Sequence, residues 1–103
     1  MNKYQILISQ RAFSNINECV LFVKNVFIDA SIELYQEIIN KIKDLSVFPE
    51  KYHEISSLRI RESRIHKMPV HEGRYHVLYR IESNTVIILD VIDSRKDQIL
   101  NRL

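Results

Sequence analysis

The chain has 103 residues, of which 46 % are apolar and 27 % are charged, so residues 1–103 can form one soluble domain with a real core. Its single cysteine excludes a disulfide framework and a cysteine-built zinc site. The sequence has no apolar run near the ~18 residues of a membrane span and no basic-then-apolar leader. We therefore expect a cytoplasmic protein without membrane contact.

The net charge of +2 is small, but the cations are unevenly distributed. Residues 51–80 contain seven lysines and arginines, three acidic residues and all four histidines. A basic patch of this kind favours contact with an anionic partner. A solvated sheet face that carries charge explains the distribution equally well.

The first third of the chain predicts a strand followed by two helices. Residues 3–9 alternate in polarity, which indicates a strand, and Ser9 can cap the helix that follows. Two apolar stripes with intervals of three and four then predict a helical hairpin, whose second helix is capped by Asp29 or Ser31 and stops at Phe48-Pro49. The first stripe consists of Phe13, Ile16, Val20, Val23 and Phe27, widened by Ala12, Cys19 and Val26. The second consists of Ile32, Tyr35, Ile39 and Ile42, widened by Leu34, Ile38 and Leu45.

The second half predicts a loop and then extended segments. Residues 50–57 lack a period, whereas residues 58–61 and 64–70 are extended in character, with Pro69 suited to a strand end or an edge. Gly73 suits a reversal with positive φ. Two strands follow, over residues 74–82 and 85–92, joined by Ser83-Asn84 with Asn84 in the left-handed conformation.

The faces of these two strands define the expected layers. Tyr75, Val77, Tyr79 and Ile81 share one face of the first strand, and Arg74, His76 and Arg80 lie on the other. In the second strand Val86, Ile88 and Ile92 share a face. A short C-terminal helix begins at Asp93-Ser94. The predicted fold is α+β: an N-terminal strand and a helical hairpin pack on the tyrosine-bearing face of a mostly antiparallel sheet, whose other face stays bare.

Three parts of the chain together resemble toxins of the RelE/ParE superfamily. They are residues 45–50 (Leu-Ser-Val-Phe-Pro-Glu), the strand pair 64–70 and 74–81 with its Tyr-x-Val-Leu-Tyr-Arg, and residues 91–97, which end in Arg-Lys-Asp. The resemblance implies the toxin of a bacterial type II toxin–antitoxin pair, of the kind that stabilises plasmids, with this fold. It also implies a cognate antitoxin that neutralises the toxin and alone contacts operator DNA.

The superfamily has two branches with different targets. RelE-like toxins cut messenger RNA in the ribosome without a metal, and ParE-like toxins inhibit DNA gyrase. A ribonuclease needs a base, an acid and cations around the phosphate. Glu50 or Glu54 can supply the base, His53 or His76 the acid, and Arg64, Arg74 and Arg95 the cations.

Two features favour the ParE-like branch, which acts by contact and not as an enzyme. No histidine or tyrosine follows Tyr79, although ribonuclease relatives commonly carry one near the C-terminus. The modest net charge also disfavours tight docking into ribosomal RNA. A degenerate member that only binds its antitoxin is a third reading. No cofactor and no metal are expected.

Two sets of contact residues follow from this interpretation. We predict that the target is bound by Arg74, Arg80, Arg95 and Lys96. Arg95 has the alternative role of neutralising Asp93 or Asp97. We predict that the antitoxin covers apolar residues that the stripes do not need, unless these close the small core. They are Leu21, Phe22, Ile28, Leu100 and Leu103.

Overall fold

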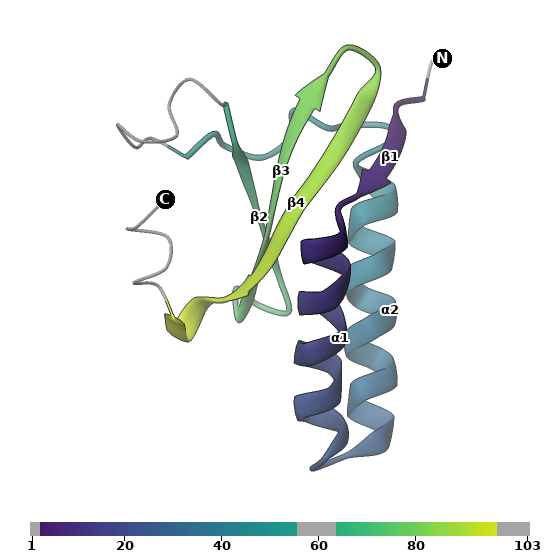
Figure 1. The fold of residues 1–103 in the computed structure, drawn as a ribbon, viewed down its shortest axis with the longest axis vertical. Coiled ribbons are helices and arrows are strands. Elements are labelled where there is room, and N and C mark those ends of the chain that lie inside the picture. The colour runs from purple at the N-terminus through teal and green to yellow at the C-terminus, as the bar shows by residue number, and fades with distance from the viewer. Residues whose placement is uncertain (1–2, 56–63, 97–103) are drawn as a thin grey trace.

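The computed structural model describes residues 3–55 and 64–96, and they form two layers (Figure 1). The order of the strands in the sheet is β1-β4-β3-β2, with β1 parallel to β4 and the other pairs antiparallel. The predicted fold class is therefore confirmed. In chain order the elements are β1 (Gln5–Ile8), α1 (Gln10–Lys24), α2 (Ile28–Asp44), β2 (His66–Val70), β3 (Tyr75–Glu82), β4 (Thr85–Asp93) and a 3₁₀ turn (Ser94–Lys96).

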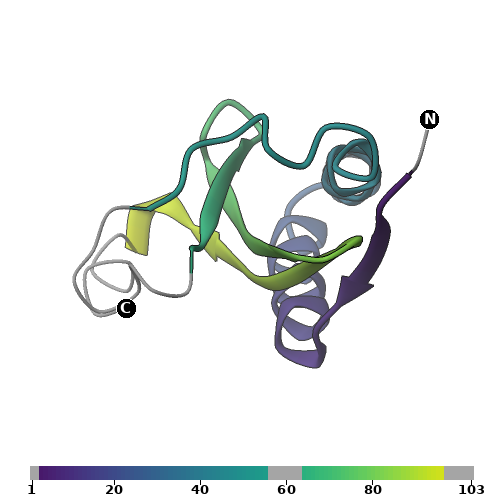
Figure 2. The same ribbon diagram turned by 90° about the horizontal axis from the view of Figure 1, so that it is seen from above.

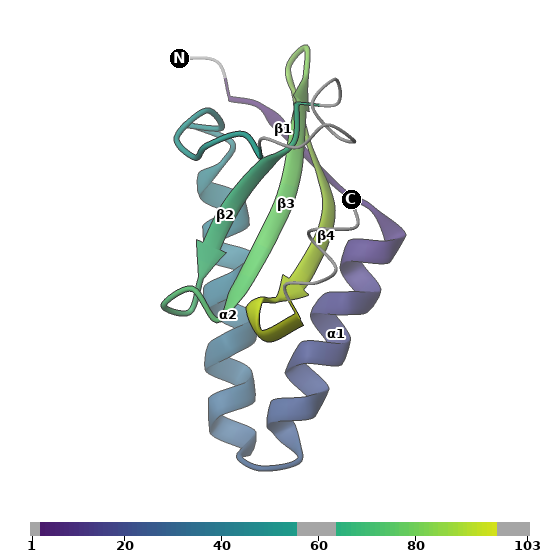
Figure 3. The ribbon, with the colours of Figure 1, turned by 90° about the vertical axis from the view of Figure 1, so that its left-hand side faces the viewer.

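The helices α1 and α2 form a hairpin on one side of the sheet (Figure 2). Seen from the other side, β2 and β3 lie in front of α2 (Figure 3). Of the predicted C-terminal helix, the described part contains only the 3₁₀ turn, and residues 97–103 lie outside it. The extended segment predicted at residues 58–61 also lies outside the described residues. Neither described helix is long and apolar enough to cross a membrane.

The two helices begin in different ways. The Oγ of Ser9 accepts a hydrogen bond from the Ala12 amide at 3.0 Å and donates one to the Leu89 carbonyl, which confirms Ser9 as a cap and ties α1 to β4. The predicted caps of α2 are wrong. Phe27 holds the cap position without a side-chain bond, and the Ser31 hydroxyl donates to the Ile28 carbonyl inside the helix. The helix also ends at Asp44, before Phe48-Pro49.

The apolar stripes were predicted too wide and, in α2, centred on the wrong side. The apolar helix positions buried in the core are Ala12 and Ile16 in α1 and Leu34, Ile38 and Ile42 in α2. Cys19, Val20 and Val23 of the first predicted stripe are partly buried and pack against this core. Several predicted core residues are instead exposed, because a helix buries only one stripe. They are Phe13, Val26, Phe27, Ile32 and Tyr35.

The helix-facing side of β3 carries the tyrosine face as predicted, and Tyr79 is the largest fully buried side chain of the described residues. Its hydroxyl donates a hydrogen bond of 2.6 Å to the Pro49 carbonyl, and its ring stacks on His66 at 5.0 Å between centroids. Burial raises the pKa of Tyr79 to about 12. Tyr79 thereby fixes the segment after α2 to the sheet.

A β-bulge changes the faces of β4. Opposite Leu78 and Tyr79 the register passes from Asp90 to Ile88, so Leu89 is an extra residue. The extra residue reverses the alternation, as a bulge does. Val86 and Ile88 face the helices, but beyond the bulge Val91 does so in place of Ile92, and the predicted face of Ile92 is wrong.

The face opposite the hairpin is not bare as predicted. Ile65, Leu78 and Ile92 form a second small cluster there, against Ile55 and Leu89. His76 and Arg80 are consequently half-buried.

Both predicted reversals occur. Gly73 has a φ of +82°, preceded by two further residues with positive φ, His71 and Glu72. At the hairpin after β3, Ser83 rather than Asn84 takes the positive φ.

Candidate functional site

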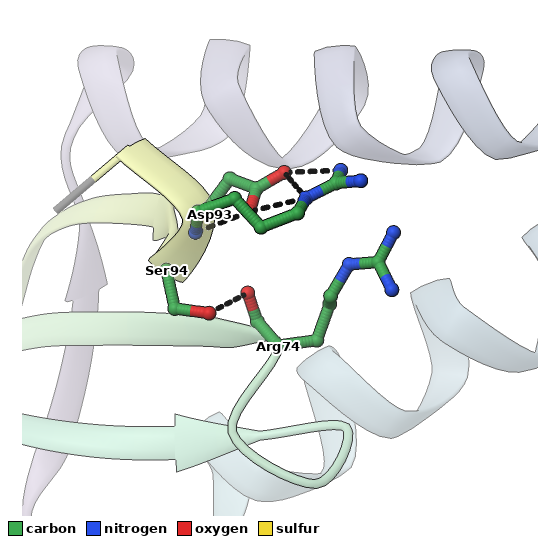
Figure 4. Close-up of polar contacts among 4 residues, drawn as sticks. Arg74, Asp93 and Ser94 are labelled. Atoms are coloured by element: carbon green, nitrogen blue, oxygen red, sulfur yellow. Dashed lines mark hydrogen bonds and ion pairs between the residues drawn. The ribbon is translucent and has the colours of Figure 1, made fainter.

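The end of β4 is joined to the start of β3 by a compact corner. The backbone amide and the hydroxyl of Ser94 both donate to the Arg74 carbonyl at 2.8 Å (Figure 4). In the ladder Tyr75 lies opposite Asp93. This corner brings two predicted target-binding residues, Arg74 and Arg95, next to one carboxylate.

Arg95 is engaged by Asp93. Its Nε lies 3.1 and 3.2 Å from the two carboxylate oxygens, and one terminal nitrogen lies 2.6 Å from Oδ2. The Asp93 carboxylate also accepts a bond from the Arg95 amide. The hydrogen bond from the Arg95 side chain lowers the pKa of Asp93, and the same contact raises the pKa of Arg95. The alternative role considered for Arg95, neutralising Asp93, is thus the one that its contacts show.

Asp93 gives a pH-dependent contribution to stability. Because its pKa is lower in the folded state than the ordinary 3.8, the contribution is complete above that value and is lost as the pH falls through the folded pKa. We expect Asp93→Asn to destabilise the protein near neutral pH, and we expect this difference from the wild type to shrink in acid. Urea unfolding over a pH series measures it. A difference that is the same at every pH contradicts the assignment.

Arg74 lies at the same corner, but its side chain makes different contacts from that of Arg95. Its side chain is exposed, and within the described residues it has neither an ion pair nor a hydrogen bond. Its charge contributes to lowering the pKa of Asp93, so the guanidinium lies within electrostatic reach of that carboxylate. Arg74 was predicted on the open face with His76, but it precedes β3, where strand alternation no longer sets its direction.

An amphipathic groove of about 510 Å³ runs between α1 and this corner. Leu21 and Phe22, two of the predicted antitoxin contacts, line it and are 57 % and 61 % exposed. They do not close the core. The other lining residues are Glu18, Cys19, Asn25, Tyr75, Asp93 and Arg95.

Of the three remaining predicted antitoxin contacts, the structure describes only Ile28. Ile28 is also exposed, at the start of α2, but it does not line this groove. Leu100 and Leu103 lie outside the described residues. The sequence analysis missed exposed apolar side chains on the same hairpin, which it had placed in the core. The signal for them is the surplus of apolar positions over what one stripe per helix buries. They are Phe13, Val26, Phe27, Ile32 and Tyr35.

Some ribonuclease candidates gather on the open face instead. His53, Glu54, Lys67 and His76 line one pocket of about 510 Å³, together with Lys51, Tyr52, Ile55 and Pro69. The Nε of Arg64 lies 3.3 Å from the Glu54 carboxylate. Glu50 lines a different hollow, with Tyr4 and Phe48.

The two remaining predicted target contacts are Arg80 and Lys96. Arg80 pairs with Glu82 at 3.1 Å, and its buried Nε has no hydrogen-bond partner among the described residues. The backbone of Lys96 ends the 3₁₀ turn. Over the described ranges, no three His, Cys, Asp or Glu side chains form a group that could hold a metal ion.

The fold resembles that of a solved structure. A solved structure described as a chromosomal ParDE toxin–antitoxin system from P. aeruginosa matches with a TM-score of 0.73, covering 88 % of this chain and 96 % of that one. At 11 % identity this likeness defines the class of fold. The model of the family described as the ParE toxin of the type II toxin–antitoxin system parDE matches residues 6–98. The chain therefore belongs to the ParE toxin family. No curated protein matches it.

Proposed function

We propose that this ParE-family toxin arrests growth by binding DNA gyrase, and that a cognate antitoxin neutralises it and contacts operator DNA on its behalf. The observation that carries the proposal is the corner at Arg74. There the exposed Arg74, which has no ion pair in the described structure, lies within electrostatic reach of Tyr75 and Asp93, and these two residues line the groove together with Leu21 and Phe22. Arginine and aromatic side chains next to apolar surface are typical of protein–protein contacts.

The distribution of the candidate catalytic residues supports contact rather than bond breaking. General acid–base chemistry needs acid, base and cation within hydrogen-bond reach of one phosphate. Arg95 lines the groove beside α1. His53 and His76 line a second pocket, between residues 51–55 and the sheet, and Glu50 lines a third hollow. The seven candidates therefore do not all converge on one point.

One observation favours a second function, ribosome-dependent cleavage of messenger RNA. The pocket on the open face combines two imidazoles, His53 and His76, with the Glu54 carboxylate and the Lys67 ammonium. These groups can act as acid, base and electrostatic stabiliser. Arg64 contacts Glu54 of this pocket at 3.3 Å, whereas Arg95 lines the groove beside α1 instead.

An expression experiment distinguishes the two functions. The toxin is induced in cells that lack the antitoxin, and protein and DNA synthesis are followed by pulse labelling. We expect cleaved DNA and filamentous cells while translation continues at first. With purified gyrase and a supercoiled plasmid, the toxin should increase linear DNA. Immediate loss of translation with intact DNA overturns the proposal in favour of the ribonuclease, and then His76→Ala should abolish the arrest. Normal growth at full expression supports a member that only binds its antitoxin.

A further inference from the structure

The turn between β2 and β3, residues 71–74, has an unusual backbone and lies next to α2 (Figure 3). His71, Glu72 and Gly73 have φ values of 55°, 56° and 82°, so three consecutive residues are left-handed. Glycine adopts this region freely, whereas a residue with a Cβ atom is disfavoured there. The glycine therefore explains one of the three positions, and contacts with the rest of the fold must hold the other two.

Glu37 of α2 supplies such a contact. Its Oε2 accepts a hydrogen bond of 2.6 Å from the His71 amide, and its Oε1 lies 3.1 Å from Nδ1 of the same residue. An ionised carboxylate only accepts hydrogen bonds, so the Nδ1 atom that faces it carries a proton. The imidazole oriented in this way lies 6.3 Å from the ring of Tyr75, between centroids. Glu37 thus fixes both the backbone and the ring of the first left-handed residue.

The other end of the turn is held through the backbone of Arg74. Its amide donates to the His71 carbonyl at 3.0 Å, and its carbonyl accepts the two hydrogen bonds from Ser94 (Figure 4). The Arg74 side chain, in contrast, is exposed and has neither an ion pair nor a hydrogen bond within the described residues. The fold therefore fixes the point from which this guanidinium extends and leaves the group itself available.

We propose that Glu37 is a positioning residue for target binding, which holds the left-handed turn and thereby directs Arg74 toward the target. This inference rests on the proposed function, since that function assigns Arg74 to the target. Glu37 does not line the groove, so it acts through the turn. A side chain that is already held near its bound orientation loses less conformational freedom when the complex forms.

Binding of the purified full-length toxin to gyrase tests the proposal. Glu37→Ala should lower the affinity by about tenfold, because the turn relaxes and misplaces Arg74. Glu33→Ala is the matched control: it removes the same residue type one turn earlier in α2, where the side chain is exposed. The control should change the affinity by less than about twofold. Unchanged binding of gyrase by Glu37→Ala overturns the proposal.

A double-mutant cycle distinguishes positioning from a general effect on the fold. In the Arg74→Ala background, Glu37→Ala should cause less than about twofold further loss, because both changes remove the same contact. Additive losses overturn the proposal. Glu37→Gln keeps one acceptor oxygen, should give an intermediate loss, and takes the place of the alanine variant in the cycle if that variant does not fold.

Nuclear magnetic resonance relaxation reports the turn itself, without any target. The order parameters of the Gly73 and Arg74 amides should fall from about 0.85 in the wild type to below about 0.6 in Glu37→Ala. Unchanged order parameters overturn the role of Glu37 in holding the turn.

Growth arrest without antitoxin separates this inference from the choice of target. If the wild-type chain arrests growth but does not bind gyrase, only the proposed target is wrong, and Glu37→Ala should still weaken the arrest while Glu33→Ala does not. Full arrest by Glu37→Ala overturns the inference alone. A wild-type chain that does not arrest growth overturns both the inference and the proposed function.

Discussion

Cells that express the Arg74→Ala variant without antitoxin are expected to grow, whereas cells that express the wild-type chain arrest. The guanidinium of Arg74 is exposed and has no ion pair in the described structure, so it is available to a target. Truncating one partner of a buried charge pair in an interface costs about 2 kcal/mol or more, which corresponds to a loss of ~30-fold in affinity. Plating efficiency and gyrase binding by the purified variant measure the effect.

The matched control is an exposed cation of the hairpin. Lys43→Ala removes the same charge from the last turn of α2, away from the corner, and should leave toxicity intact. Affinity for the antitoxin should stay within a few-fold in both variants. If the Arg74→Ala variant is fully toxic, Arg74 does not contribute to binding of the target.

Two isoleucines of α2 provide the largest expected difference in stability. Ile38 is 0 % exposed and lies in the main core, while Ile32 is 52 % exposed. We expect Ile38→Ala to lower the free energy of unfolding by about 2–5 kcal/mol, because it leaves a cavity between α2 and the sheet. Ile32→Ala should change it by less than about 1 kcal/mol.

Urea unfolding followed by circular dichroism gives both values, and the two variants share a helix and a residue type. The assignment of the buried stripe is contradicted if the two losses are equal or reversed. Reduced antitoxin binding by Ile32→Ala at unchanged stability would place Ile32 on the interface.

The strands and the cap of α1 could be predicted from the sequence because local chemistry determines them. Ser9 stands before an apolar period, and the alternation from Tyr75 to Ile81 specifies the buried face of β3. The buried side of α2 could not be predicted in the same way. Two overlapping stripes of similar hydrophobicity fit this helix, and packing against the sheet selects the one that contains Leu34 and Ile38.

The candidate site was predictable in its residue types but not in its pairing. Arg95 stood out as a cation beyond the last strand and Arg74 as a cation on a sheet face, but only the corner geometry shows that Asp93 holds Arg95 and leaves Arg74 exposed. Leu21 and Phe22 were found as apolar residues that the core did not need. The groove beside them depends on how α1 lies against β4, which no local pattern specifies.

The extra residue in β4 determines which face of the sheet carries the side chains at the end of this strand. With Leu89 absorbed in the bulge, Asp93 lies opposite Tyr75 and borders the groove of α1. If Leu89 were instead paired in a regular ladder without the bulge, the side chains after it would change faces, and Asp93 would project from the other side of the sheet. The bulge therefore determines that the Asp93–Arg95 ion pair lies on the side of the sheet that faces α1.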